Sequence, residues 1–205
     1  MRFRFLALLY LLAVGCAPAS AAARGTIVIL GDSLSSGYGL GGAPSWVTLL
    51  QDRLDAQGYE YDVVNASIAG DTSAGGLARL PRLLQSHSPD VVILEMGGND
   101  GLRGQPTSVL RDNLRQMIQL SKDHGAEVLV AGIQIPPNYG PAYTQSLARI
   151  YPELSAEMSV ALVEFLMDGV ALNADLMQFD RVHPNPDGQP VMLENVWPVL
   201  TGLLE

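Results

Sequence analysis

Four short segments carry residues whose types could together perform acyl transfer. The segments are Gly31-Asp32-Ser33, Ala69-Gly70-Asp71, Gly97-Gly98-Asn99-Asp100 and Asp180-Arg181-Val182-His183-Pro184. A serine nucleophile needs a base to accept its proton, the base needs a carboxylate to orient it, and the developing oxyanion needs fixed hydrogen-bond donors. The four segments contain each of these parts, so they predict nucleophilic chemistry at a serine.

The types of the individual residues suit separate roles in such a site. Asp180 and His183 are three positions apart, a spacing that brings a carboxylate beside an imidazole and suits an orienting acid and its base. Glycine at position 70 allows the backbone to approach an oxyanion closely, and the amide of Asn99 can donate a hydrogen bond without carrying charge. Each segment alone is also a common turn composition, so the prediction depends on their combination.

Buried strands and amphipathic helices alternate along the chain and must position these segments. The expected strands are 26–30, 61–65, 91–96, 127–135 and 161–165. Apolar residues at helical spacing predict helices between Ser45 as N-cap and Gly58 as stop, from 110 toward Gly125, and over 77–85, 143–158 and 188–203. Pro81, Pro152 and Pro198 predict a break or a kink in three of these helices.

This alternation predicts one α/β domain over residues 24–205. Strands that alternate with helices form βαβ units, and therefore a parallel sheet covered on both faces. We expect a three-layer α/β/α sandwich of about five strands in the order 2-1-3-4-5. The four segments named above then meet at the carboxyl edge of the sheet, because three of them follow a strand and the fourth lies near the end of the domain.

Residues 1–23 have the pattern of a secretory signal peptide. Arg2 and Arg4 precede a short apolar stretch and a small-residue zone, and cleavage is expected after Ala21 or Ala23. Alternatively, residues 13–16 resemble a lipobox, in which case Cys16 would carry a lipid anchor. We therefore expect a periplasmic or secreted protein, or a membrane-anchored lipoprotein, without a transmembrane span in the mature chain.

The charge of the chain argues against nucleic acid as a partner. The formal net charge is −9, and without Arg2 and Arg4 ten basic and 21 acidic residues remain, a net charge of −11. The basic residues are scattered, so a nucleic-acid-binding surface is not expected. Three dispersed histidines and a single cysteine give no spacing typical of zinc ligands.

The four segments resemble the blocks of the SGNH, or GDSL, hydrolase superfamily. The matching residues are Gly31-Asp32-Ser33-Leu34, Gly70, Gly98-Asn99-Asp100 and Asp180-x-x-His183. The sequences "VVNASIAGDTS", "GLARLP", "GGNDGLRG", "PPNYGPAY" and "HPNPDGQP" are similar to its branch of bacterial periplasmic thioesterases, lysophospholipases and arylesterases. The resemblance covers nearly all of the mature chain and implies a flavodoxin-like fold.

The resemblance also implies a role for each site residue. Ser33 would be the nucleophile, His183 the base and then the acid, and Asp180 its orienting partner. The backbone N–H groups of Ser33 and Gly70 and the side-chain amide of Asn99 would hold the oxyanion. No cofactor or metal is implied, and the substrates would be acyl esters, thioesters or lysophospholipids, with an apolar wall that includes Ile135, Pro136 and Tyr139.

Three other interpretations use the same residues. Residues 37–42 read G-x-G-x-x-G, the dinucleotide fingerprint, but six residues separate them from the preceding strand, which argues against a nucleotide site. An α/β-hydrolase would need G-x-S-x-G, which the sequence lacks. A non-catalytic acyl- or glycan-binding module on the same fold would not need Ser33, and it remains the alternative to an esterase.

Overall fold

A single parallel sheet organises residues 24–204, which are the residues that the computed structural model describes. Its strands are β1 (Gly25–Gly31), β2 (Tyr61–Asn65), β3 (Val91–Glu95), β4 (Glu127–Ala131) and β5 (Ala161–Val163). The order across the sheet is β2-β1-β3-β4-β5, and every pairing is parallel. The predicted strand order is therefore confirmed.

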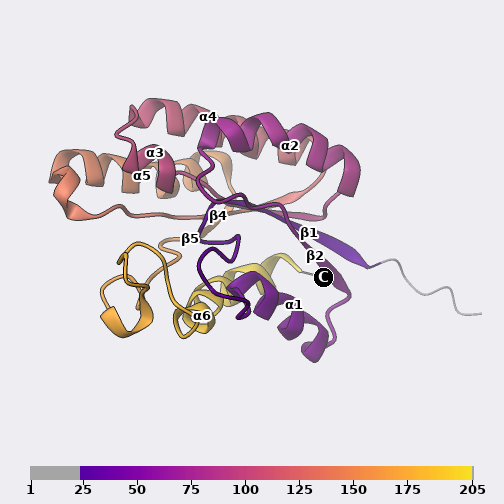
Figure 1. Ribbon diagram of the computed structural model, residues 1–205. Coiled ribbons are helices and arrows are strands. Elements are labelled where there is room, and N and C mark those ends of the chain that lie inside the picture. The colour runs from indigo at the N-terminus through magenta and orange to yellow at the C-terminus, as the bar shows by residue number, and fades with distance from the viewer. Residues whose placement is uncertain (1–23, 205) are drawn as a thin grey trace, which may run out of the picture.

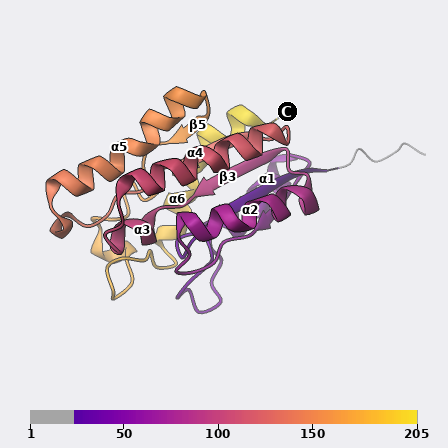
Figure 2. The same ribbon diagram turned by 90° about the horizontal axis from the view of Figure 1, so that it is seen from above.

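Helices cover both faces of this sheet, which confirms the three-layer sandwich (Figure 1). One face carries α1 (Trp46–Gln57) and α6 (Gly188–Leu200). The other carries α2 (Ser73–His87), α4 (Thr107–Asp123) and α5 (Pro141–Met158), which lie side by side when the molecule is seen from above (Figure 2). The short elements are α3 (Gly98–Leu102), η1 (Pro137–Tyr139), η2 (Ala174–Leu176) and η3 (Thr201–Leu203).

The strands are apolar without alternation because both of their faces are buried. In β3, Val91 and Ile93 pack into the cluster on the α1 and α6 side, whereas Val92 and Leu94 pack into the cluster under α2, α4 and α5. Successive side chains of a strand point to opposite faces, so a strand between two helical layers needs apolar residues at every position.

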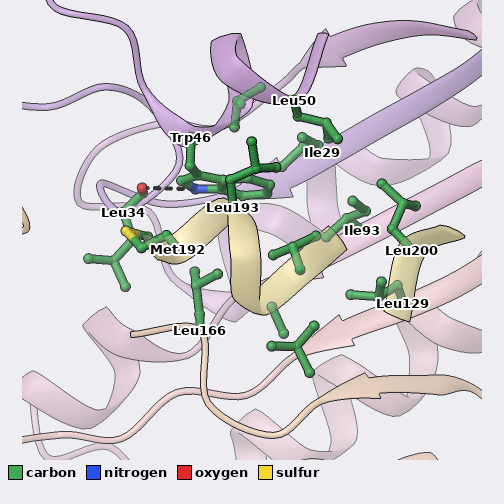
Figure 3. Close-up of a cluster of buried hydrophobic side chains, with 14 of the residues drawn as sticks. Ile29, Leu34, Trp46, Leu50, Ile93, Leu129, Leu166, Met192, Leu193 and Leu200 are labelled. Atoms are coloured by element: carbon green, nitrogen blue, oxygen red, sulfur yellow. Dashed lines mark hydrogen bonds between the residues drawn. The ribbon is translucent and has the colours of Figure 1, made fainter. Parts of the chain in front are cut away.

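The cluster on the α1 and α6 side also reaches the end of β1. Figure 3 shows Trp46 of α1 among Ile29, Leu50 and Leu193, with its ring nitrogen aimed at the backbone of Leu34. Trp46 is fully buried, and its Nε1 donates to the Leu34 carbonyl at 3.2 Å. The hydrophobic core thus extends directly to the segment that contains Ser33.

Helix α1 begins and ends where its sequence predicts. The Ser45 side chain accepts a hydrogen bond from the Thr48 N–H, and Gly58 closes the helix with a positive φ of 78°. These are the N-cap and the left-handed C-cap that satisfy the free backbone groups at helix ends.

The predicted ends of β4 and β5 were wrong. β4 stops at Ala131 rather than at residue 135, and β5 stops at Val163 rather than at residue 165. Gly132 explains the first stop: its N–H donates to the Val163 carbonyl, and a Cβ there would come within 2.1 Å of the Glu164 carbonyl oxygen. The chain turns at this close approach, so the apolar residues after Gly132 leave the sheet.

The predicted helix ends also needed correction. α2 begins at Ser73, four residues before the predicted start, because the Thr72 side chain caps it by accepting from the Gly75 N–H. The three prolines expected to break or kink helices lie inside α2, α5 and α6, so none of them ends its helix. All three are exposed, so the carbonyl groups that they leave without a partner can face water.

Some predictions concern residues outside the described part of the chain. The signal peptide over 1–23, its cleavage sites and the lipobox cysteine Cys16 all lie there. Among residues 24–204, no helix is long and apolar enough to cross a membrane.

Candidate active site

Ser33 lies in the turn that follows β1, and hydrogen bonds fix the chain on both sides of it. The Asp32 N–H donates to Glu95 Oε2 at 3.1 Å, and the Leu34 N–H donates to Asp32 Oδ1 at 3.1 Å. The Leu34 carbonyl accepts the bond from Trp46 Nε1 (Figure 3). The serine is therefore held between two anchored neighbours at the carboxyl edge of the sheet.

The structure brings Ser33, His183 and Asp180 into one hydrogen-bonded chain. His183 Nε2 lies 2.9 Å from Ser33 Oγ, and His183 Nδ1 lies 2.7 Å from Asp180 Oδ2. The other carboxylate oxygen of Asp180 accepts from the N–H groups of Val182 and His183, each at 3.0 Å. This is the order of nucleophile, base and orienting acid that acyl transfer requires.

The environment of Asp180 favours its charged form. Partial burial by itself raises the pKa of this carboxyl, but the hydrogen bonds from the His183 ring and from two backbone N–H groups outweigh it and lower the pKa to about 2. The carboxylate therefore remains ionised at neutral pH, where it can hold the imidazole in one orientation.

A tight loop presents Asp180 and His183 together. The Gln178 N–H donates to the His183 carbonyl at 2.7 Å, and the Arg181 N–H donates to the Gln178 carbonyl at 2.9 Å. Arg181, between the two site residues, has a φ of 56°, which is uncommon for a residue other than glycine. The Tyr38 ring packs beside the His183 ring with centroids 4.6 Å apart, and limits how the imidazole can move.

Asn99 is placed by a short helix that the sequence did not predict. It lies in the first turn of α3, and its Nδ2 donates to Asp32 Oδ2 at 2.9 Å. A side-chain amide has two N–H groups, so one remains for a substrate when the other binds Asp32. The amide is therefore oriented by the residue that precedes Ser33.

Gly70 occupies a turn after β2 with a φ of 81°, a conformation that glycine adopts without strain. Arg103, at the end of α3, donates from Nη2 to the Gly70 carbonyl at 2.8 Å. The Ile68 N–H also donates to the Gly31 carbonyl at 3.0 Å, which fastens this turn to the end of β1. Gly70 itself does not line the pocket described below. Its turn is hydrogen-bonded to α3 and to the end of β1, and residues of α3 and of the segment after β1 line that pocket.

Two buried acids accept hydrogen bonds from Asn99 and from the neighbours of Ser33. Asp32 is 2 % exposed and Glu95, the last residue of β3, is 0 % exposed. Burial raises the pKa of Asp32 to about 6, against hydrogen bonds from Leu34 and Asn99 that lower it. Burial, and next the neighbouring Asp32 carboxylate, raise the pKa of Glu95 well above its ordinary value.

A pocket of about 410 Å³ opens beside the triad. Ser33, Asn99 and His183 are among its lining residues, and the remaining wall is mainly apolar. A cavity of this size and lining is typical of a small-molecule site. The geometry therefore places the Ser33 hydroxyl and the Asn99 amide in the wall of a mainly apolar cavity.

Two of the three residues predicted for the substrate wall line the pocket. Ile135 and Pro136 line the pocket, as expected. Tyr139 does not: it lies in η1, and its hydroxyl donates to the Leu102 carbonyl at 2.9 Å, which holds the ring away from the cavity. Ile135 reaches the pocket because β4 ends early and the following residues leave the sheet.

Sequence reasoning missed several residues of the site. Leu102, Met167 and Ala171 line the pocket, and they come from α3 and from the irregular chain after β5, where no periodic pattern marks them. Glu95 was also missed, although a single acid in the run "VVILEM" was a signal that could have been used.

Comparison with known proteins places this geometry in a family. Residues 29–191 match the model of the GDSL-like Lipase/Acylhydrolase family. The chain belongs to this family. Esterase TesA of Pseudomonas aeruginosa is 51% identical over 89% of this chain and 91% of its own length. Thioesterase 1/protease 1/lysophospholipase L1 of Escherichia coli is 47% identical over 85% of this chain and 82% of its own.

The solved structures agree with this membership in the GDSL-like family. The crystal structure of TesA is similar with a TM-score of 0.85 and 51% sequence identity, and the match covers 87% of this chain and 99% of that one. The family match and the names of the curated relatives together identify the chain as a hydrolase, a serine esterase of the SGNH type.

Proposed function

We propose that Ser33 is the nucleophile of this GDSL-like esterase, His183 its general base and Asp180 the acid that orients His183. The observation that carries the proposal is the 2.9 Å contact between Ser33 Oγ and His183 Nε2 beside the apolar pocket. Ser33 Oγ attacks the carbonyl carbon of the ester, and its proton passes to His183 Nε2.

The proposed oxyanion site consists of the backbone N–H groups of Ser33 and Gly70 and the free N–H of the Asn99 side chain. The carbonyl oxygen becomes negatively charged as Ser33 attacks, and fixed donors stabilise this charge without having to reorganise. Collapse of the intermediate expels the alcohol or thiol, which takes the proton from His183. Water then attacks the acyl-serine with His183 again as base, and the acid leaves.

The substrates that we propose are carboxylic esters and thioesters of apolar acyl chains. The apolar pocket wall, which includes Ile135 and Pro136, suits an acyl chain next to Ser33. The net charge of −11 for residues 24–205 opposes strongly anionic substrates such as acyl-CoA. Lysophospholipids and other short-to-medium acyl esters are therefore the proposed physiological substrates, and thioester hydrolysis is secondary.

We propose export as the setting for this activity, because residues 1–23 have the pattern of a signal peptide. Mass spectrometry of the mature protein from its native host would test this. An N-terminus at residue 22 or 24 supports a free exported enzyme, whereas a lipidated Cys16 supports the anchored form.

A hydrolysis profile tests the proposed function. The rate of hydrolysis by purified protein would be measured with p-nitrophenyl esters of increasing acyl length, a lysophospholipid and an acyl-CoA. The Ser33→Ala variant is the control. We expect turnover of the esters and of the lysophospholipid that is lost in Ser33→Ala. A folded wild-type protein that hydrolyses none of them would contradict the proposal and favour a non-catalytic acyl- or glycan-binding module.

A further inference from the structure

Glu95 is a fully buried acid that the proposed mechanism does not use. It ends β3 beside Gly31, the last residue of β1, and its Oε2 accepts from the Asp32 N–H at 3.1 Å and from the Ser35 hydroxyl at 2.7 Å. These two donors lie on either side of Ser33 in the sequence. One carboxyl group thus binds the nucleophile segment at both of its ends.

The titratable groups next to Glu95 are mainly acidic. Asp32, itself 2 % exposed, is the neighbouring titratable group, and none of the ion pairs within residues 24–204 includes Glu95 or Asp32. His183 and Asp100 also act on Asp32: the imidazole lowers the pKa of Asp32 and the Asp100 carboxylate raises it. The Tyr151 hydroxyl donates a hydrogen bond to the Met96 carbonyl. Two ionised carboxylates buried side by side without a cation would be strongly destabilising.

The second oxygen of Glu95 indicates which acid keeps a proton. Oε1 is buried and accepts no hydrogen bond within residues 24–204. A protonated Glu95 can donate to the neighbouring Asp32 side chain, and this contact contributes to the raised pKa of Glu95. An ionised Glu95 would leave half of its negative charge on this unsolvated oxygen. Asp32, in contrast, accepts from Leu34 through one oxygen and from Asn99 through the other, so both oxygens of its carboxylate are satisfied.

We propose that Glu95 is a positioning residue that remains protonated in the folded enzyme, where it fixes the Ser33 segment and leaves Asp32 ionised to orient Asn99. This role rests on the proposed function, because it acts through the nucleophile and the amide donor. Glu95 does not line the pocket, so its effect is expected on turnover rather than on substrate binding. A neutral polar residue of the same shape should preserve this positioning role, whereas an apolar residue should not.

Three substitutions test this role. In Glu95→Gln, which resembles a protonated glutamic acid, we expect kcat on p-nitrophenyl butyrate within about threefold of wild type. In Glu95→Leu, which leaves the Asp32 N–H and the Ser35 hydroxyl without their acceptor, we expect kcat to fall by about tenfold or more, with KM within about twofold. Glu127→Leu is the matched control, because Glu127 is an exposed acid at the start of the adjacent strand β4, and it should not change either constant.

Infrared spectroscopy tests the proton directly and does not depend on activity. At about pH 8 the ordinary carboxyl groups and Asp32 are ionised, so the carbonyl stretch of a protonated acid should come from Glu95 and disappear in Glu95→Gln. Absence of this band in the wild type, a loss of more than about tenfold in Glu95→Gln, or a folded Glu95→Leu with wild-type kcat would each overturn the proposal.

These experiments also distinguish a failure of the Glu95 proposal from a failure of the proposed esterase function. If Glu95→Leu does not fold by near-ultraviolet circular dichroism, the infrared band and the kcat of Glu95→Gln decide the question. If folded wild-type protein hydrolyses no ester, the proposed function fails, and the infrared band still tells whether Glu95 holds a proton.

Discussion

The imidazole Nε2 of His183 lies 2.9 Å from the hydroxyl oxygen of Ser33, although the two residues are 150 positions apart in the sequence. β1 delivers the serine to the edge of the sheet, and the loop before α6 delivers the histidine to the same place. The parallel sheet therefore brings the proposed nucleophile and the proposed base together from opposite ends of the chain. The expected effects of substitution follow from this arrangement.

Removal of the Asn99 amide should slow the chemical step. One oxyanion donor is worth about 3–4 kcal/mol, so Asn99→Ala should lower kcat by about 10²–10³-fold with a smaller change in KM. Steady-state kinetics on a p-nitrophenyl ester measures this. Gln119→Ala is the matched control, because that amide is exposed on α4 and binds Asp123, and Gln119 does not line the pocket. Wild-type kcat in Asn99→Ala would remove Asn99 from the proposed oxyanion site.

Replacement of Asp180 should affect both turnover and acid stability. Asp180→Asn no longer fixes the orientation of His183, and kcat should fall by about 10³–10⁴-fold. The pKa of Asp180 is lowered to about 2 in the folded state, so its carboxylate stabilises the fold above its unfolded pKa and loses that effect as the pH falls.

Urea unfolding over a pH series checks the second effect. The stability advantage of wild type over Asp180→Asn should be present at about pH 5 and should shrink between about pH 4 and pH 2. An advantage that stays constant over that range would show that the Asp180 carboxyl is not held in its charged form by the fold.

A larger side chain at position 171 should shorten the acyl chain that the enzyme accepts. Ala171 lines the pocket, so Ala171→Leu should lower kcat/KM for an octanoyl ester by about tenfold relative to the acetyl ester. Ala174→Leu is the matched control, since Ala174 is exposed in η2 and does not line the pocket. Equal effects of Ala171→Leu on both esters would mean that the acyl chain lies elsewhere.

Loss of the Trp46 ring nitrogen should weaken the support of the Ser33 segment. In Trp46→Phe the buried Leu34 carbonyl loses its donor, which should cost about 1–3 kcal/mol in the free energy of unfolding and lower kcat as well. Trp197→Phe provides the comparison, because Trp197 is only partly buried and packs on Tyr59 and Arg53. An unchanged kcat and an unchanged urea midpoint in Trp46→Phe would contradict this role.

The sequence was sufficient to predict the elements with strong patterns. The run that forms β2, the cap at Ser45 and the stop at Gly58 all have local causes, and the structure confirms them. The end of β4 could not be predicted in this way. An apolar run looks the same whether it continues a buried strand or lines a pocket, and only the contact of Gly132 with the chain after β5 separates the two.

The candidate site was predictable where a residue's type defines its role. Ser33, Asp180 and His183 could be selected because acyl transfer requires those side chains, and the structure brings them together. Tyr139 does not line the pocket, because its hydroxyl binds the Leu102 carbonyl, a backbone contact that residue type alone does not predict. Helix α3 is only five residues long, too short to show periodicity, so the placement of Asn99 depends on tertiary contacts with Asp32.

Covalent labelling of Ser33 tests the central claim most directly. Folded wild-type protein would be treated with a p-nitrophenyl alkylphosphonate and examined by intact-mass and peptide mass spectrometry, with Ser33→Ala and Ser36→Ala in parallel. We expect one adduct per chain on the peptide that contains Ser33, retained in Ser36→Ala, absent in Ser33→Ala and matched by loss of esterase activity. A folded wild-type protein without an adduct, or one labelled at another residue while Ser33→Ala remains active, would contradict the account.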